Sequence, residues 1–229
     1  MTAPLASAPG ERLRPHRRRR LALVLATHEG TSRIEALSDA VFAIAATLLV
    51  IELKIPRGLT DSARFLDALA TQWPVYVGYV MSFVYLGIYW SHHVHVFRLF
   101  RRTDHVFLKL NVLFLMTIAL IPFPTALLGV YWHAHDDRTR TALLVYASSL
   151  FVTASLFLAI WLHATHNRRL VDPELDDDVI RATTERYLIG PIGYGASFLV
   201  AWWSPVAGAL IILLIALFYI LPVQLVRHG

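Results

Sequence analysis

The chain has 229 residues, of which 56% are hydrophobic and 16% are charged, and it contains no cysteine. Soluble domains average roughly 45–50% apolar and 25% charged residues, so this composition excludes an ordinary soluble fold. The lack of cysteine excludes disulfides, iron–sulfur clusters, thiolate metal sites and cysteine nucleophiles. The formal charge of +5 does not predict a nucleic-acid partner, because the basic residues stand at the ends of apolar blocks.

The apolar residues gather in six blocks, each about long enough for a helix that crosses a hydrocarbon core of roughly 30 Å. We place the blocks at residues 34–54, 72–96, 106–131, 141–163, 187–203 and 205–226. Helices are predicted, because backbone in lipid must satisfy its own hydrogen bonds and the blocks lack the alternation of barrel strands. The predicted fold class is therefore an all-α membrane protein with six transmembrane helices in one domain, residues 31–229. An Arg-rich segment, residues 1–30, precedes this domain.

The distribution of basic residues predicts the orientation in the membrane. Of the 21 Lys and Arg residues, 16 fall on the side of the two termini, and five fall on the other side: Lys54, Arg57, Arg64, Arg138 and Arg140. By the positive-inside rule, both termini are predicted to be cytoplasmic. The run Arg17–Arg20 is followed by only six apolar residues, which is short for a secretory signal, so we interpret it as a membrane-surface anchor.

The first block carries charge into the apolar region. The helix is expected to begin at a cap at Thr31 or Ser32, which places Asp39 about 12 Å or less along the helix axis from its start. An unpaired carboxylate at this depth would cost several kcal/mol, so Asp39 requires a partner. At 100° per residue, an aliphatic stripe lies on the opposite side of the helix. Its members are Ile44, Leu48, Ile51 and Ile55, and the stripe fits either lipid contact or a hydrophobic pore constriction.

Two motifs in the first two blocks resemble those of a known family. The first motif lies between Arg33 and Leu49. It consists of Arg33, three intervening residues and the triplet Leu37-Ser38-Asp39, and the segments Val41-Phe-Ala-Ile44 and Thr47-Leu-Leu49 follow it. This pattern is similar to the RxxxFSD first-helix signature of the transmembrane protein 175 family of endolysosomal potassium channels, with Leu37 in place of Phe. The run Trp90-Ser-His-His-Val-His-Val-Phe97 resembles the tryptophan and histidine cluster of its second helix. Bacterial members carry a single six-helix unit, as this chain does.

The resemblance implies a homotetramer in which the first helix lines a central pore permeable to potassium ions, without a cofactor, in a lipid bilayer such as the bacterial plasma membrane. It implies that Ile44, Leu48 and Ile51 form the pore constriction. A supporting network that packs the pore helix is implied for Arg33, Ser38, Asp39, Trp90 and His93. The alternative assignment of Asp39 as an ion-binding carboxylate stays open.

The sequence contains nothing similar to the TVGYG loop that gives dehydrated potassium a set of carbonyl rings. The run Gly190–Gly195 lacks the context of a pore loop, and a kinked helix entry is the better interpretation. Selectivity is therefore expected to depend on the narrow aliphatic constriction, with Thr47 as a candidate polar contributor, and to be modest.

Other classes of function have weaker support. His92, His93 and His95 suggest a metal site, but no carboxylate follows at a suitable spacing, so no metal is expected. No G-x-S-x-G or comparable nucleophile motif occurs, so no enzyme activity is expected. The main alternative to a channel is a proton- or cation-coupled secondary transporter, which should show repeats or broken helices around a midplane site. A membrane scaffold without transport is a third possibility.

Overall fold

The structure, a computed structural model, describes residues 15–58, 61–134 and 136–220, with side chains from Ser32 onward. The described residues are mostly helical, and the rest form turns, short irregular segments and one isolated antiparallel β-bridge between Phe100 and Val171. The all-α prediction is therefore confirmed for them. The α-helices are α1 (Pro15–Ile51), α2 (Ser62–Thr71), α3 (Trp73–Leu99), α4 (His105–Leu120), α5 (Pro122–Tyr131), α6 (Asp137–Thr165), α7 (Asp177–Ala201) and α8 (Pro205–Ile220). Two 3-10 turns, Trp132–Ala134 and His166–Arg168, follow α5 and α6.

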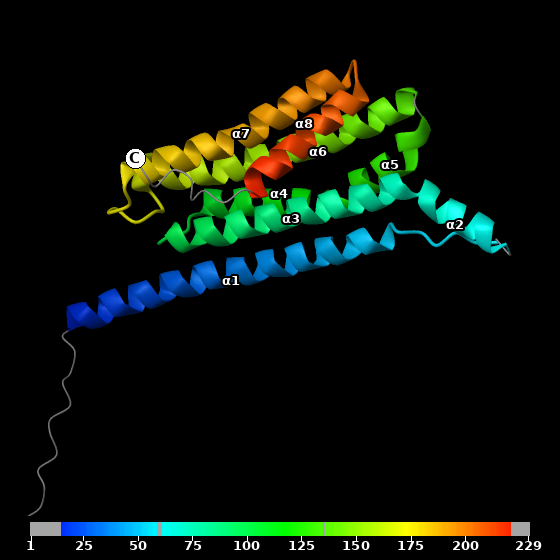
Figure 1. Ribbon diagram of the computed structural model, residues 1–229. Helices are drawn as coiled ribbons and strands as arrows, with labels where there is room; N and C mark the ends of the chain where they lie inside the picture. Colours follow the sequence, from blue (N-terminus) through cyan, green and yellow to red (C-terminus); the bar gives the residue numbers. More distant parts are fainter. Residues whose placement is uncertain (1–14, 59–60, 135, 221–229) are drawn as a thin grey trace, which may run out of the picture.

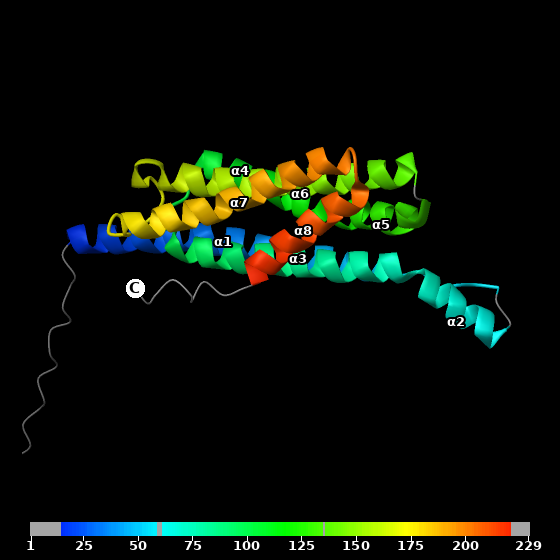
Figure 2. The same ribbon diagram turned by 45° about the horizontal axis from the view of Figure 1, so that its top comes forward.

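The long helices run side by side along one axis (Figure 1), and α1 lies at the edge of the bundle, where it contacts α3 and α4. Helix α8 crosses the bundle obliquely, and α2 projects past its end (Figure 2). The α3–α4 turn and the α6–α7 loop lie together at the opposite end. We call this the basic end, after Arg98, Arg101, Arg102, Arg168 and Arg169.

The start of α1 and the presence of α2 differ from the sequence-based expectation. Helix α1 begins at Pro15, so the expected start at Thr31 or Ser32 is wrong, and the basic run Arg17–Arg20 belongs to the same helix. Proline is favoured in the first turn of a helix, and the Arg, Leu and Ala residues that follow are good helix formers. The short helix α2 was not expected. Its N-cap is Asp61, whose carboxylate accepts a hydrogen bond from the Ala63 N–H at 3.1 Å.

The third apolar block is divided at Ile121 into α4 and α5, because Pro122 and Pro124 cannot donate the backbone hydrogen bonds that a continuous helix needs. Three described stretches are long and apolar enough to cross a membrane, namely Ser32–Ile51, His105–Ala134 and Asp137–Arg168. Helix α8 is apolar but shorter. Helix α3 is long enough and has one charged residue, Arg98, but it is rich in tyrosine, tryptophan and histidine. Helix α7 is also long enough, but charged residues occupy its first half.

The basic end is held together by contacts between two loops that are distant in sequence. The backbone N–H of Arg101 donates to the Leu170 carbonyl at 2.7 Å, beside the Phe100–Val171 bridge. The Arg101 guanidinium also lies 3.1 Å from the Asp172 carboxylate. These contacts fix the ends of α3 and α4 against the ends of α6 and α7.

Asp104 joins α4 to α6 at this end. Its carboxylate accepts a hydrogen bond from the Phe107 N–H at 2.8 Å, which caps α4, and lies 2.9 Å from His163 Nε2 and 4.0 Å from Arg169. Burial raises the pKa of Asp104, but the hydrogen bonds from Phe107 and His163 and the charge of Arg169 together outweigh burial, so this pKa lies below its usual value. A lowered pKa stabilises the fold above the ordinary aspartate pKa of about 3.9, and the contribution is lost as the pH falls through the folded-state value.

We expect Asp104→Ala to lower the melting temperature at pH 7 by about 2–4 °C, because loss of an N-cap costs about 1 kcal/mol in a protein of this size. The difference from wild type should shrink as the pH falls below about 4 toward the lower folded-state pKa, because the native carboxylate becomes protonated only there. Thermal unfolding of the detergent-solubilised protein at pH 7 and at about pH 3 measures this. Asp67→Ala is the control, because Asp67 is exposed on α2 and makes no ion pair with another described residue. An equal loss at both pH values would show that ionisation of Asp104 does not contribute.

Candidate functional site

Helix α1 has a buried face and an exposed aliphatic face. Ser38, Phe42, Ala45 and Leu49 follow a spacing of three or four residues, and each is at most 4% exposed against α3 and α4. The aliphatic stripe lies on a different side and is uncovered: Ile44 is 58%, Leu48 41% and Ile51 67% exposed. Packing against α3 and α4 therefore fixes the rotation of α1, while the rest of the described chain leaves the stripe uncovered.

A buried chain of polar side chains connects α1, α4 and α3. The amide of Asn111 donates to the Ser38 hydroxyl at 3.4 Å, and its oxygen lies 3.2 Å from His93 Nε2. Ser38 in turn donates to the Ile34 carbonyl at 2.8 Å. All three side chains are at most 2% exposed. The structure thus brings the predicted residues Ser38 and His93 together through Asn111, which sequence reasoning missed.

Aromatic rings enclose His93. It stacks on Phe97 with ring centroids 4.0 Å apart and on Phe114 at 6.0 Å, while Phe42 of α1 meets it edge-on at 5.9 Å. Leu37, which replaces the signature phenylalanine, is 51% exposed and lies outside this cluster. Phe42 therefore supplies the aromatic contact between α1 and His93.

A second polar contact between α1 and α3 lies on the surface. Trp90 Nε1 donates to Asp39 Oδ1 at 2.9 Å, and both residues are exposed. Arg33 is also exposed and forms no ion pair with a described residue. The five predicted network residues are thus divided into a buried pair linked by Asn111, an exposed pair, and Arg33 apart from both.

Thr47 lies on the exposed surface of α1 beside the aliphatic stripe. Its hydroxyl donates to the Ile44 carbonyl of the same helix at 2.8 Å. This bond uses the proton and leaves the oxygen lone pairs free to accept from water or to coordinate a cation.

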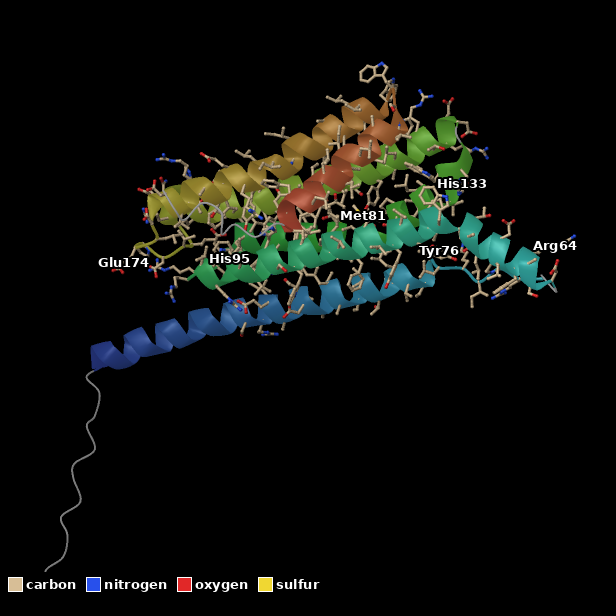
Figure 3. All side chains as sticks on the ribbon, viewed as in Figure 1. Arg64, Tyr76, Met81, His95, His133 and Glu174 are labelled. Atoms are coloured by element: carbon tan, nitrogen blue, oxygen red, sulfur yellow. The ribbon has the colours of Figure 1, made fainter. Side chains whose placement is uncertain are left out.

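The histidines do not gather into a metal site in the described residues. His93 belongs to the buried polar chain, His92 packs edge-on against Tyr187 and Tyr219, and His95 is exposed. His95 and His133 lie at opposite ends of the bundle (Figure 3). No group of three or more His, Asp or Glu residues in the described part of the chain is arranged to hold a metal ion.

The Gly190–Gly195 run lies inside the continuous helix α7, with Pro191 within the helix, and does not form a loop. Gly190 lies close to α6 and α8, because a Cβ there would be 3.1 Å from the Ala154 Cβ and 3.3 Å from the Tyr219 hydroxyl. Close helix packing accounts for this glycine.

Comparison with known proteins adds the following matches. Residues 33–122 match the family described as the endosomal/lysosomal potassium channel TMEM175. A protein named as a potassium channel in Streptomyces collinus is 40% identical over 164 residues, which cover 72% of this chain and 79% of that protein. The chicken protein named as the endosomal/lysosomal proton channel TMEM175 is 30% identical over 62% of this chain and 30% of its own length.

A solved structure supports the same relationship. The crystal structure of a lysosomal potassium-selective channel TMEM175 homologue from Chamaesiphon minutus superposes with a TM-score of 0.75 at 35% identity. The match covers 84% of this chain and 97% of that one. These relatives are ion channels and not enzymes. The sequence identity, the extent of the matches and the shared fold show that the chain belongs to the TMEM175 family.

Proposed function

We propose that this protein is a passive potassium channel in which four copies surround a central pore lined by α1. The observation that carries the proposal is the uncovered aliphatic stripe on a helix whose other face is fixed by buried contacts. Potassium is proposed as the transported ion because relatives of this chain are named as potassium channels. In this proposal α1, α3, α4 with α5, α6, α7 and α8 provide six crossings of the plasma membrane, with both termini cytoplasmic.

The exposed stripe is compatible with a tetramer because a single chain does not enclose it. Lipid could also cover these aliphatic side chains at no cost, so the stripe alone does not require assembly. Arg33 and Asp39 on the same helix, however, are exposed charges, which are expensive in hydrocarbon unless they face a protein interface or water. Four α1 helices around one axis would give both charges such surroundings.

The proposed pore acts by dehydration. Rings of Ile44, Leu48 and Ile51 offer a passing ion no oxygen ligands, so an ion that is stripped of water there loses hydration energy without replacement. Potassium holds its water less tightly than sodium and therefore crosses with the smaller penalty. Thr47, with free lone pairs beside the stripe, would supply compensating oxygens. The resulting preference for potassium is expected to be modest.

The polar contacts between α1 and its neighbours have a positioning role in this proposal. The buried chain of Ser38, Asn111 and His93 and the exposed pair of Asp39 and Trp90 hold α1 at two faces. A rotation of α1 by one residue would turn the stripe by about 100° and break both contacts. We infer that these contacts set which α1 side chains face the pore.

The deciding experiment is cation flux into liposomes that contain the purified protein, measured for potassium, sodium and protons under imposed gradients. We expect passive potassium flux that exceeds sodium flux and needs no coupling ion. The proton measurement is included because the chicken relative is named as a proton channel. Potassium uptake that occurs only with a proton or sodium gradient would instead establish the coupled transporter. No flux from confirmed tetramers at any pH tested would contradict the channel.

Asp39→Ala should reduce the tetramer fraction while changing the thermal stability of the subunit little, because Asp39 is exposed in the single chain and its hydrogen bond to Trp90 is exposed. The chain contains no cysteine, so Ile55→Cys, placed at the exposed end of the stripe beyond α1, allows copies to be crosslinked specifically. The ladder of crosslinked species measures assembly.

Asp39→Asn is the matched control, because an amide oxygen still accepts from Trp90 Nε1 but carries no charge. Loss of tetramer in Asp39→Ala alone would assign the effect to the hydrogen bond, and loss in both variants would assign it to the charge. An unchanged crosslink ladder in Asp39→Ala would contradict a role in assembly.

A further inference from the structure

An apolar pocket with a volume of about 200 Å³ lies among α3, α5, α6 and α8. Trp73 at the start of α3 and Trp132 after α5 belong to its wall, which places it toward the end of the bundle from which α2 projects (Figure 1). The floor is buried, since Leu143 and Ile212 are at most 3% exposed. The rim is uncovered, since Val77 is 50% exposed. The pocket therefore opens on the surface of the bundle.

The hydroxyl groups of the pocket wall, on Thr125 and Tyr146, are already engaged within the protein. The buried Ser82 hydroxyl lies 2.7 Å from Thr125 Oγ1 and 2.9 Å from the Tyr146 hydroxyl. Thr125 Oγ1 donates to the Ile121 carbonyl at 2.8 Å, so Ser82 donates to Thr125 and Tyr146 donates to Ser82. All three protons are therefore used. A bound water needs roughly two to four polar partners, so this wall suits an apolar occupant better than water.

The size of the pocket and its place in the membrane indicate the kind of occupant. An apolar cavity of about 150 Å³ in another protein stays dry and binds benzene, so the present pocket accepts an apolar group of at least that size. Two stretches that supply its wall, His105–Ala134 and Asp137–Arg168, are long and apolar enough to cross a membrane. Tryptophan is enriched at the level of lipid headgroups, so Trp73 and Trp132 place the pocket next to that level. At this depth a bilayer supplies hydrocarbon chains.

Small residues on two helices leave space for the pocket. Gly78 lines it from α3, and Ala209 lines it from α8. A Cβ on Gly78 would lie 3.6 Å from the Thr125 methyl group, which is an ordinary van der Waals contact. Gly78→Leu is therefore tolerated at its Cβ, and the rest of the new side chain would occupy pocket space.

We propose that this pocket binds one acyl chain of a bilayer phospholipid, whose headgroup lies at the level of Trp73 and Trp132. The chain fills a void that the side chains of the subunit leave open, and it links α8 to α3 and α5. Helix α1 supplies none of the described lining residues, so the site is separate from the proposed pore. Its occupancy is therefore independent of potassium transport.

The first test is the lipid dependence of thermal unfolding of the delipidated full chain in detergent. Dioleoyl phosphatidylglycerol at about ten times its Kd should raise the melting temperature of the wild type by about 3–6 °C. Gly78→Leu should remove most of this rise, because its side chain takes the place of the acyl chain. Gly87→Leu is the matched control and should keep the full rise, since Gly87 lies on the same helix, does not line the pocket and has open space around a Cβ.

Ala209→Leu fills the pocket from α8 and keeps the test decisive if Gly78→Leu does not fold. Native mass spectrometry of the same samples counts the phospholipids that stay bound. Each pocket-filling variant should hold one phospholipid fewer per subunit than the wild type and Gly87→Leu. Equal stabilisation by lipid and equal lipid counts in the wild type and in a folded pocket-filling variant would overturn the proposal.

Two other results would also overturn it. A melting temperature that rises with oleate but not with phospholipid, and only while the pocket is unfilled, would assign the pocket to free fatty acids. Efficient disulfide crosslinking of Val77→Cys between copies in native membranes would place the rim at a subunit interface, because the chain has no other cysteine. Absence of that crosslink, together with a phospholipid effect confined to the unfilled pocket, would support the acyl-chain site.

Discussion

Replacement of Leu48 by serine should raise potassium flux about tenfold and lower the preference for potassium over sodium. In a tetramer the substitution removes four aliphatic side chains from one ring of the proposed constriction and replaces them with hydroxyls that hydrate an ion. A barrier lowered by about 1.4 kcal/mol is enough for a tenfold change in rate. Ile44→Ser should act in the same direction. Liposome flux with potassium and with sodium, normalised to tetramer content, measures both quantities.

Val50→Ser is the matched control. Val50 is an exposed aliphatic residue of the same helix, 50% exposed compared with 41% for Leu48, but it lies about 200° away around the helix axis. A general effect of serine on α1 or on the lipid-facing surface would appear in both variants. Unchanged flux and selectivity in Leu48→Ser and Ile44→Ser would refute the assignment of the stripe as the constriction.

Among the residues that hold α1 against its neighbouring helices, Asn111 should be the one whose substitution, Asn111→Leu, lowers the stability of the protein most. It removes the amide that bridges α1 and α3 and leaves the buried His93 and Ser38 without this partner. A buried polar group left unsatisfied costs about 1–3 kcal/mol, so we expect a loss of about 2–3 kcal/mol and a melting temperature lower by roughly 5–10 °C. Potassium flux should fall as well, because α1 loses a contact that fixes its rotation.

Thr117→Val provides the comparison for Asn111→Leu. Thr117 is a buried polar residue of the same helix, but its hydroxyl donates only to the Phe114 carbonyl of α4 itself. Removing that bond does not disconnect α4 from another helix. A loss of stability in Asn111→Leu no larger than in Thr117→Val would contradict the bridging role.

Local patterns in the sequence were sufficient to predict that the protein is a helical membrane protein. Apolar blocks of membrane length and the scarcity of charge predicted helices, because each helix in lipid must satisfy its own backbone hydrogen bonds. The motif of Arg33, Ser38 and Asp39 led to the correct family. The 3.6-residue period of α1 also predicted an aliphatic stripe separate from Asp39, and the structure leaves that stripe exposed.

The errors and omissions have local causes of two kinds. The start of α1 and the short helix α2 were missed because the Arg-rich run carries no apolar period, and because α2 is a single amphipathic segment outside the apolar blocks. Leu37 stands where the family signature has phenylalanine, and Phe42 on the buried face supplies the aromatic contact instead. A helical-wheel comparison places Phe42 near Ser38 and was the signal that could have shown this.

The sequence by itself determined the membrane class, the all-α fold, the family and the amphipathic division of α1, because each depends on composition or on residues within one helix. Only the tertiary structure decided that Asn111 joins Ser38 to His93 and that Asp39 pairs separately with Trp90. Ser38 and Asn111 are 73 positions apart, and Asp39 and Trp90 are 51 apart. Side chains so distant along the chain meet only when packing fixes the rotation of each helix relative to its neighbours. The hydrophobic period within a single helix does not predict that relative rotation.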